Sequence, residues 1–136
     1  MSLMESTFHA WLHAYGAAWE AGDADAYLPL FAEEAVYHWT PFEAPRRGHD
    51  EIRAALVTVL ERQSDVSFRF EIIAVTGDTG WAKWDAGFLR EGTAYPVRVD
   101  GVLSARFDAD DKCVEFREWW HALEPGQSDE MRAVDA

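Results

Sequence analysis

Helical and strand-like patterns occupy separate parts of this sequence. Up to Gln63, apolar residues recur mainly at spacings of three and four, whereas from Val66 onward they follow strand-like patterns. Strands that alternate with helices build parallel sheets, but strands grouped after helices favour an antiparallel sheet with the helices packed on one face. The order of the patterns therefore predicts an α+β fold with a mainly antiparallel sheet.

Three helices are expected before the main run of strands. Ser6 or Thr7 can cap the first helix and Gly22 can end it, while Asp23 can cap the second. Asp50 precedes the third apolar stripe. The helices are expected at residues 6–21, 23–31 and 50–63, with one short strand at 35–40 between the second and third.

The second half of the chain predicts four strands separated by turns that are rich in Gly, Asp and Thr. The strands are expected at residues 66–75, 80–89, 94–107 and 114–121. Residues 125–136 are acidic and lack apolar periodicity, so they predict a flexible tail behind a single domain at 1–124.

Charge and composition exclude several classes of partner. Acidic residues outnumber basic ones by 25 to 12, and the net charge of −13 repels phosphate backbones and anionic lipid, so no nucleic acid partner is expected. No apolar run reaches the roughly 20 residues that cross a bilayer. The single cysteine, Cys113, cannot form an internal disulfide, and no export signal is visible. We therefore expect a cytoplasmic protein with no membrane partner.

Charged and aromatic residues are mixed on single strand faces, which is typical of a pocket that carries chemistry. Lys83 and Asp85 share a face with Trp81, and Glu118 shares one with Phe116 and Trp120. The alternation alone does not choose which face points inward. A carboxyl group among aromatic rings is desolvated and its pKa rises, which suits a general acid or base. The catalytic candidates are Asp85 and Glu118, with Lys83 holding one of them ionised.

Each candidate also has a purely structural interpretation. Lys83 and Asp85 can be a solvated surface pair, and Glu118 can form an ordinary salt bridge between strands. His38 and His121 can act as bases or simply hydrogen-bond within the fold. His9 and His13 lie one helical turn apart, but no third ligand with metal-site spacing follows, so no metal or other cofactor is expected.

Four segments together resemble the nuclear-transport-factor-2-like superfamily, specifically its SnoaL-like branch. They are Trp19-Glu20-Ala21-Gly22-Asp23, Leu30 to Tyr37, Gly48 to Arg53, and Glu115 to His121. The resemblance implies a cone-shaped curved sheet with three N-terminal helices around a deep pocket, and homodimers that pair through the outer sheet face. The superfamily includes polyketide cyclases, epoxide hydrolases, steroid isomerases, dehydratases and noncatalytic binders, so the fold alone does not assign a reaction.

Comparison with the limonene-type epoxide hydrolases of this superfamily suggests which strand faces point inward. Their Asp-Arg-Asp set corresponds here to Asp85, Lys83 and Glu118, and their water-positioning tyrosine and asparagine correspond to Tyr37 and Trp39. Three of the five positions therefore differ, which disfavours epoxide hydrolysis because lysine lacks the guanidinium fork of arginine. The comparison predicts that the inward-facing residues that bind substrate are Tyr37, Trp39, Trp81, Phe116 and Trp120.

Two functional hypotheses follow from the sequence. In the first, the protein is a cofactor-independent enzyme that performs acid/base chemistry on a small, largely apolar molecule: isomerisation, cyclisation, dehydration or hydrolysis. In the second, it is a noncatalytic ligand-binding or accessory domain whose charged groups only orient the ligand. A purely structural dimeric module is a third alternative, but it gives the charges beside the aromatic residues no purpose.

Overall fold

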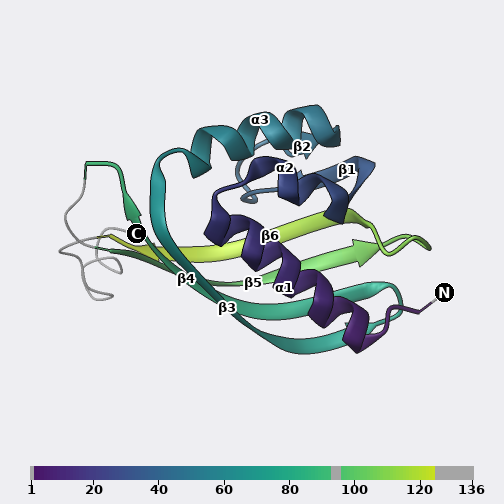
Figure 1. Ribbon diagram of the computed structural model, residues 1–136. Helices are drawn as coiled ribbons and strands as arrows, with labels where there is room; N and C mark the ends of the chain where they lie inside the picture. The colour runs from purple at the N-terminus through teal and green to yellow at the C-terminus, as the bar shows by residue number, and fades with distance from the viewer. Residues whose placement is uncertain (1, 93–95, 125–136) are drawn as a thin grey trace.

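A curved sheet carries all the helices on its concave side in the computed structural model, which describes residues 2–92 and 96–124 (Figure 1). The helical elements of this described part are α1 (Glu5–Ala21), α2 (Ala24–Tyr27), the 3-10 turn η1 (Leu28–Leu30) and α3 (Gly48–Leu60). The strands are β1 (Phe31–His38), β2 (Arg46–Arg47), β3 (Gln63–Thr76), β4 (Thr79–Arg90), β5 (Val97–Phe107) and β6 (Cys113–Leu123).

The strands form one mixed sheet in the order β2-β1-β6-β5-β4-β3. Neighbours pair antiparallel except β1 and β6, which run parallel. The predicted α+β class and mainly antiparallel sheet are confirmed. The sheet does not close into a barrel, since β2 and β3 lie at its two edges.

Irregular pairing bends the long edge strand β3. Its register against β4 shifts between Ser64 and Ser67 and again between Ile72 and Ala74. Asp65, inside the first irregularity, has a φ of 52°, a conformation that aspartate tolerates better than most residues. Extra residues on one strand increase its bend and twist, so these two points help the sheet to curve around the helices.

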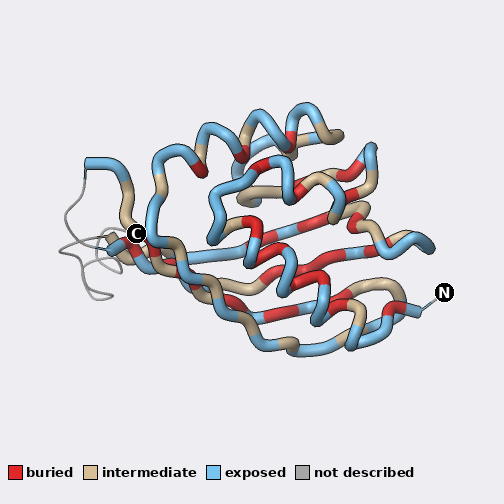
Figure 2. The backbone as a smooth tube through the Cα atoms, viewed as in Figure 1, coloured by how far each residue is buried: buried red, intermediate tan, exposed pale blue. Residues whose placement is uncertain are grey.

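Helix α1 lies across the concave face and buries one side of its surface against the sheet (Figure 2). Its buried residues Phe8, Trp11, Leu12 and Tyr15 follow the predicted helical spacing. The helix ends at Gly22, which has a φ of 65° and bonds back to the last turn, as predicted. The predicted cap at Ser6 or Thr7 is wrong, because the helix begins one residue earlier, after Met4, without a side-chain cap.

The boundary between the second helix and the first strand lies earlier than predicted. The carboxylate of Asp23 caps α2 by accepting from the backbone N–H groups of Asp25 and Ala26, at 3.0 and 3.3 Å. Pro29 has no N–H and cannot continue the helical bonding, so α2 gives way to η1. Strand β1 then begins at Phe31, but its register against β6 is irregular up to Val36, which hides the strand alternation in the sequence.

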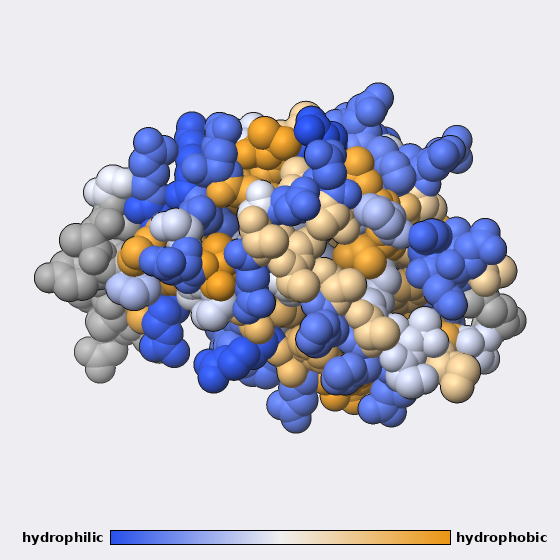
Figure 3. All heavy atoms as spheres, in the orientation of Figure 1, coloured by the Kyte–Doolittle hydropathy of each residue, from blue (hydrophilic) through white to orange (hydrophobic). Residues whose placement is uncertain are grey.

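Hydrophilic side chains surround a band of more hydrophobic residues on the helix-bearing face (Figure 3). No helix within residues 2–92 and 96–124 is long and apolar enough to cross a membrane. The predicted acidic tail at 125–136 lies outside the described residues, as does the predicted strand start at Ala94.

Candidate functional site

An aromatic pocket lies between the helices and the inner face of the sheet, with a volume of about 180 Å³. Helix α1, α2 and α3 contribute one wall, and inward-facing residues of all strands except the two-residue β2 contribute the other. The lining consists of Tyr15, Trp19, Tyr27, Tyr37, Trp39, Leu56, Val59, Leu60, Gln63, Trp84, Phe88, Arg90, Val99, Glu118, Trp120 and Ala122. Most of these side chains are apolar or aromatic, so the pocket suits a largely apolar ligand.

Glu118 is the one carboxylate in this lining, and only 7% of its surface is exposed. The hydroxyl of Tyr37 donates a hydrogen bond to Glu118 Oε1 at 2.8 Å, and the hydroxyl of Tyr15 donates to the same oxygen at 3.1 Å. No cationic side chain of the described residues forms an ion pair with Glu118, and none of these residues hydrogen-bonds its Oε2. Oε2 is therefore the oxygen left for a ligand.

Burial raises the pKa of Glu118 to about 7, against an ordinary value of 4.5. The hydrogen bonds from Tyr37 and Tyr15 act in the opposite direction, because they stabilise the charged carboxylate, but desolvation outweighs them. A carboxyl group with a pKa near 7 is populated in both protonation states near neutral pH. It can therefore accept a proton and return it, which is what a general acid/base catalyst does.

The three tyrosines around Glu118 stay protonated at neutral pH. Burial is the main cause that raises the pKa of Tyr15, Tyr27 and Tyr37 well above 10, and the nearby charge of Glu118 raises each further. Tyr15 and Tyr37 also lie within hydrogen-bonding distance of each other, with 3.0 Å between their hydroxyl oxygens. Their protons remain on oxygen, so they hold Glu118 in place as neutral donors.

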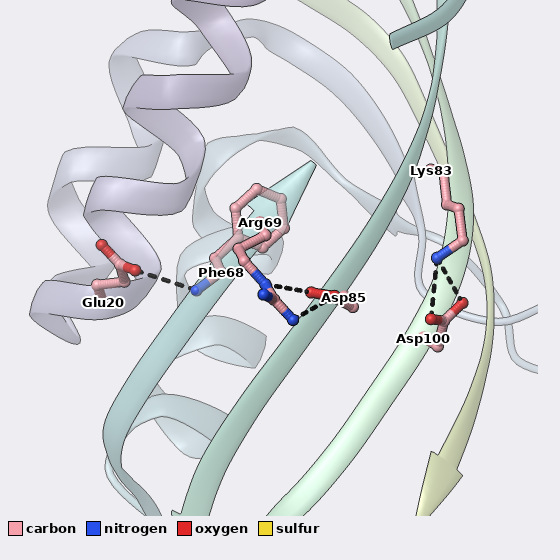
Figure 4. Close-up of polar contacts among 6 residues, drawn as sticks. All are labelled: Glu20, Phe68, Arg69, Lys83, Asp85 and Asp100. Atoms are coloured by element: carbon pink, nitrogen blue, oxygen red, sulfur yellow. Dashed lines mark hydrogen bonds and ion pairs between the residues drawn. The ribbon is translucent and has the colours of Figure 1, made fainter. Parts of the chain in front are cut away.

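Asp85 and Lys83 lie on the outer face of the sheet, away from this pocket (Figure 4). Arg69 Nε and Nη2 donate to the two carboxylate oxygens of Asp85 at 3.0 and 3.1 Å. Lys83 Nζ contacts Asp100 at 2.9 Å. The prediction that Asp85 and Lys83 point inward is wrong, and Asp85 does not meet Glu118. Each forms an ion pair with a residue on an adjacent strand instead. A surface location was the structural interpretation of both residues, but that interpretation paired them with each other.

Side chains alternate between the two faces along β4, and the residues that were predicted to point inward lie on the exposed face. The inner set is apolar throughout and consists of Gly80, Ala82, Trp84, Ala86 and Phe88, while Trp81, Lys83 and Asp85 alternate with it. A charged residue every second position beside an uninterrupted apolar set is typical of a half-buried strand. This pattern in the sequence favours the observed face, whereas the comparison with epoxide hydrolases favoured the opposite one.

The predicted ligand-binding residues divide between three locations. Tyr37, Trp39 and Trp120 line the pocket. Phe116 is fully buried behind them and stacks on Tyr37 with ring centroids 4.7 Å apart, so it supports the wall without forming it. Trp81 is on the outer face, where it stacks on Trp119 at 6.3 Å.

Several functional residues were missed because their sequence signal is that of an ordinary core. Tyr15 and Trp19 belong to the apolar stripe of α1, and Tyr27 to that of the short second helix. A tyrosine in a buried stripe needs a hydrogen-bond partner, and that need was the available clue for Tyr15. Among the described residues, no three His, Cys, Asp or Glu side chains are grouped as a metal site would require. His9 packs against the ring of Phe70 instead.

Comparison with known proteins assigns the family. A sequence model of the SnoaL-like domain matches residues 12–116, which is most of the chain. The protein therefore belongs to the SnoaL-like family of the nuclear-transport-factor-2-like superfamily. Among curated proteins, none matches the sequence well enough to count as a relative.

Solved structures with this fold include two informative neighbours. The epoxide hydrolase/cyclase-like enzyme SalBIII, described for pyran ring formation in the polyether salinomycin, superposes with a TM-score of 0.74. It is 17% identical, over 86% of this chain and 92% of the SalBIII chain. A hypothetical protein from Catenulispora acidiphila with a ketosteroid isomerase-like fold, in complex with trimethylamine, has a TM-score of 0.71 and 18% identity, over 80% of this chain and 83% of its own. At these identities the likeness shows the fold alone.

Proposed function

We propose that this protein binds a small, largely apolar molecule in the aromatic pocket and transfers a proton on it through Glu118. The observation that carries the proposal is a buried carboxyl group with a pKa of about 7 at the wall of an otherwise apolar cavity. Burying a carboxyl group without a cation costs folding stability, and such perturbed groups cluster at functional sites. The family supports a small-molecule role because it includes cyclases and isomerases.

A single carboxyl group fits isomerisation better than the other reactions considered. In an allylic shift, Glu118 Oε2 takes a proton from the carbon beside a carbonyl group and returns it to the far end of the double bond. The proton is conserved, and no second carboxylate, water or cofactor is consumed. Epoxide opening by a carboxylate pair has less support, since Asp85 is on the other side of the sheet.

The proposal is tested with 3-cyclohexen-1-one, a ring-sized β,γ-unsaturated ketone whose isomerisation to the conjugated ketone is followed by ultraviolet absorption. The wild-type protein should accelerate this reaction, and Glu118→Gln should lower kcat/KM by at least about 100-fold because the proton acceptor is lost. Asp85→Asn is the matched control and should stay within about threefold. The rate should fall as pH drops below about 7, where Glu118 becomes protonated.

A noncatalytic role is the alternative outcome of the same experiment. If wild-type protein binds cyclic ketones but neither isomerises them nor exchanges their α-protons with deuterated water, the acid/base role is wrong and the ligand-binding domain remains. Equal rates for wild type and Glu118→Gln would also reject Glu118 as the proton carrier.

We also propose a homodimer that pairs through the outer face of the sheet. Trp81 and Trp119 are 38% and 41% exposed there, and Ile73 is 57% exposed. Exposed aromatic residues on one face are typical of the centre of an interface. Light scattering should give twice the chain mass for wild type and a monomer for Trp119→Glu, while Phe42→Ser, at an exposed loop residue, leaves the dimer intact. A monomeric wild type would reject this pairing.

The cytoplasmic location of the protein stays a prediction from the sequence.

A further inference from the structure

Trp84 carries a hydrogen-bond donor that has no partner in the fold. Its side chain lines the pocket and only 4% of the residue is exposed. Within residues 2–92 and 96–124, Trp84 Nε1 is the one fully buried side-chain nitrogen or oxygen without a hydrogen bond. Nearly all buried donors in native proteins find an acceptor, so this N–H calls for an explanation.

The other indole groups of the pocket wall show that Trp84 is an exception. Trp19 Nε1 donates to Gln63 Oε1 at 2.7 Å, and Trp120 Nε1 donates to the backbone oxygen of Trp39 at 3.1 Å. Around Trp84 the neighbouring rings are those of Trp19 and Phe68, with centroids 5.7 and 6.1 Å away. Ring carbons offer no lone pair, so the N–H has no acceptor among the described residues, and a ligand oxygen in the pocket that Trp84 lines can supply one when the indole turns toward it.

Trp84 and Glu118 both lie on the inner face of the sheet, two strands apart. Trp84 on β4 pairs with Gly101 on β5, and Gly101 pairs with Trp120 on β6, two residues beyond Glu118. Two strand spacings across the sheet and two residues along it separate their Cα atoms, which is about 12 Å before the length of the two side chains is subtracted. A molecule that touches both groups therefore spans several ångströms, as a ring that carries an oxygen does.

The two groups also differ in what they recognise. An indole N–H only donates, whereas an ionised carboxylate only accepts. A ligand that fits both presents an accepting oxygen to Trp84 and a proton that can be removed or shared to Glu118. The pocket volume of about 180 Å³ is close to the roughly 150 Å³ of an apolar cavity that takes up benzene.

We infer that the natural ligand is a molecule of one or two rings with a single carbonyl or ether oxygen, and that Trp84 Nε1 donates the hydrogen bond that orients this oxygen. The inference rests on the proposed function in that the same pocket holds the ligand. It does not require Glu118 to be catalytic. It assigns Trp84 as a specificity-determining residue that favours oxygen-bearing rings over hydrocarbons of the same shape.

The test compares cyclohexanone with methylenecyclohexane, which has nearly the same shape but no oxygen. In protein labelled with ¹⁵N at tryptophan, the indole N–H signal of Trp84 should move downfield when cyclohexanone is added, and not with methylenecyclohexane. In Trp84→Phe, the preference for the ketone over the alkene should fall about three- to tenfold, which is the usual net effect of one hydrogen bond. The ratio of the two affinities cancels the change in pocket size.

Trp19→Phe is the matched control because its N–H is already bonded to Gln63. It should weaken both ligands about equally and leave their ratio unchanged. If Trp84→Phe does not fold, the indole signal of the wild-type protein decides alone. A Trp84 signal that ignores cyclohexanone, or an unchanged ratio in a folded Trp84→Phe, would overturn the inference.

Glu118→Gln separates this inference from the proposed function. The Trp84 signal and the ketone preference should persist in that variant even though isomerisation is lost. A wild-type protein that shows the ketone preference without turnover would reject catalysis and keep the Trp84 subsite. Turnover without any ketone preference would support catalysis and reject the Trp84 subsite.

Discussion

Glu118 and Asp85 are carboxylates of one sheet that lie on its opposite faces. Glu118 is 7% exposed, is held by two tyrosine hydroxyls and has no ion pair among the described residues. The Asp85 side chain is 31% exposed and receives a two-pronged contact from Arg69. The same functional group is therefore desolvated on one face and matched by a cation at the edge of solvent on the other.

The face of the strand decides the chemistry of a carboxylate more than the residues beside it in the sequence do. Trp84 and Ala86 flank Asp85 in the sequence, but alternation places both of them on the inner face while Asp85 lies on the outer one. Glu118 likewise follows Arg117, yet Arg117 contacts Glu115 on the outer face at 3.2 Å. Sequence neighbours are thus separated, and residues 81 and 103 positions away from Glu118 become its partners.

The largest effect is expected on the stability of Glu118→Gln as a function of pH. The folded-state pKa of about 7 lies above the ordinary 4.5, so between these values the folded protein binds more protons than the unfolded chain. Wild-type stability therefore falls through this window as pH rises, and the loss is complete above about pH 7. Glutamine stays neutral, so the variant should gain roughly 3 kcal/mol over wild type at about pH 8 and almost nothing near pH 4.

Urea unfolding of wild type and variant at the two pH values measures this difference. Asp85→Asn is the control on the outer face and should lose up to about 1 kcal/mol at neutral pH, because it gives up only a partly exposed ion pair. Equal destabilisation of Glu118→Gln at both pH values would mean that the carboxyl group is not desolvated, and the contrast between the faces would fail.

Regular patterns made most of the fold predictable from the sequence. The apolar stripe of α1, the glycine that ends it and the long alternating strands depend on local periodicity, which a single sequence displays. The early start of β1 and its parallel pairing with β6 did not follow from periodicity. Both depend on an irregular register between Phe31 and Val36 that tertiary contacts impose.

The site was only partly predictable, for two physical reasons. Glu118, Tyr37, Trp39 and Trp120 were assigned to the inner face by the comparison with epoxide hydrolases, and they lie there. The assignment of β4 failed because strand faces have a period of two, so an error of one residue moves every side chain to the other side. Tyr15 was missed because its hydrogen bond to Glu118 joins residues 103 positions apart.

Tyr37→Phe tests how the tyrosine hydroxyls set the pKa of the inner carboxylate. The hydroxyl of Tyr37 donates the shorter of the two hydrogen bonds to Glu118, at 2.8 Å, and this bond favours the charged form. Its removal should raise the pKa of Glu118 above 7 by roughly one to two units, as expected for a hydrogen bond to a charged group. Carboxyl ¹³C NMR titration measures the shift. Tyr27→Phe is the control, since no hydrogen bond joins Tyr27 to Glu118, and an equal shift there would assign the effect to packing.

The smallest effect is expected on the outer face, for Arg69→Gln. The Arg69 side chain is 83% exposed, so its ion pair with Asp85 is weakened by water and by salt. The variant should lose less than about 1 kcal/mol in low salt, and the difference should vanish in about 1 M NaCl. Urea unfolding at the two salt concentrations measures it, with Arg53→Gln as a matched control because Arg53 pairs with Asp25 on the helical side. A loss of several kcal/mol that salt does not reduce would mean that this face is covered, because only a pair removed from water contributes so much. The outer carboxylate would then be as desolvated as the inner one, and the covering partner, a second copy of the chain, would be the cause.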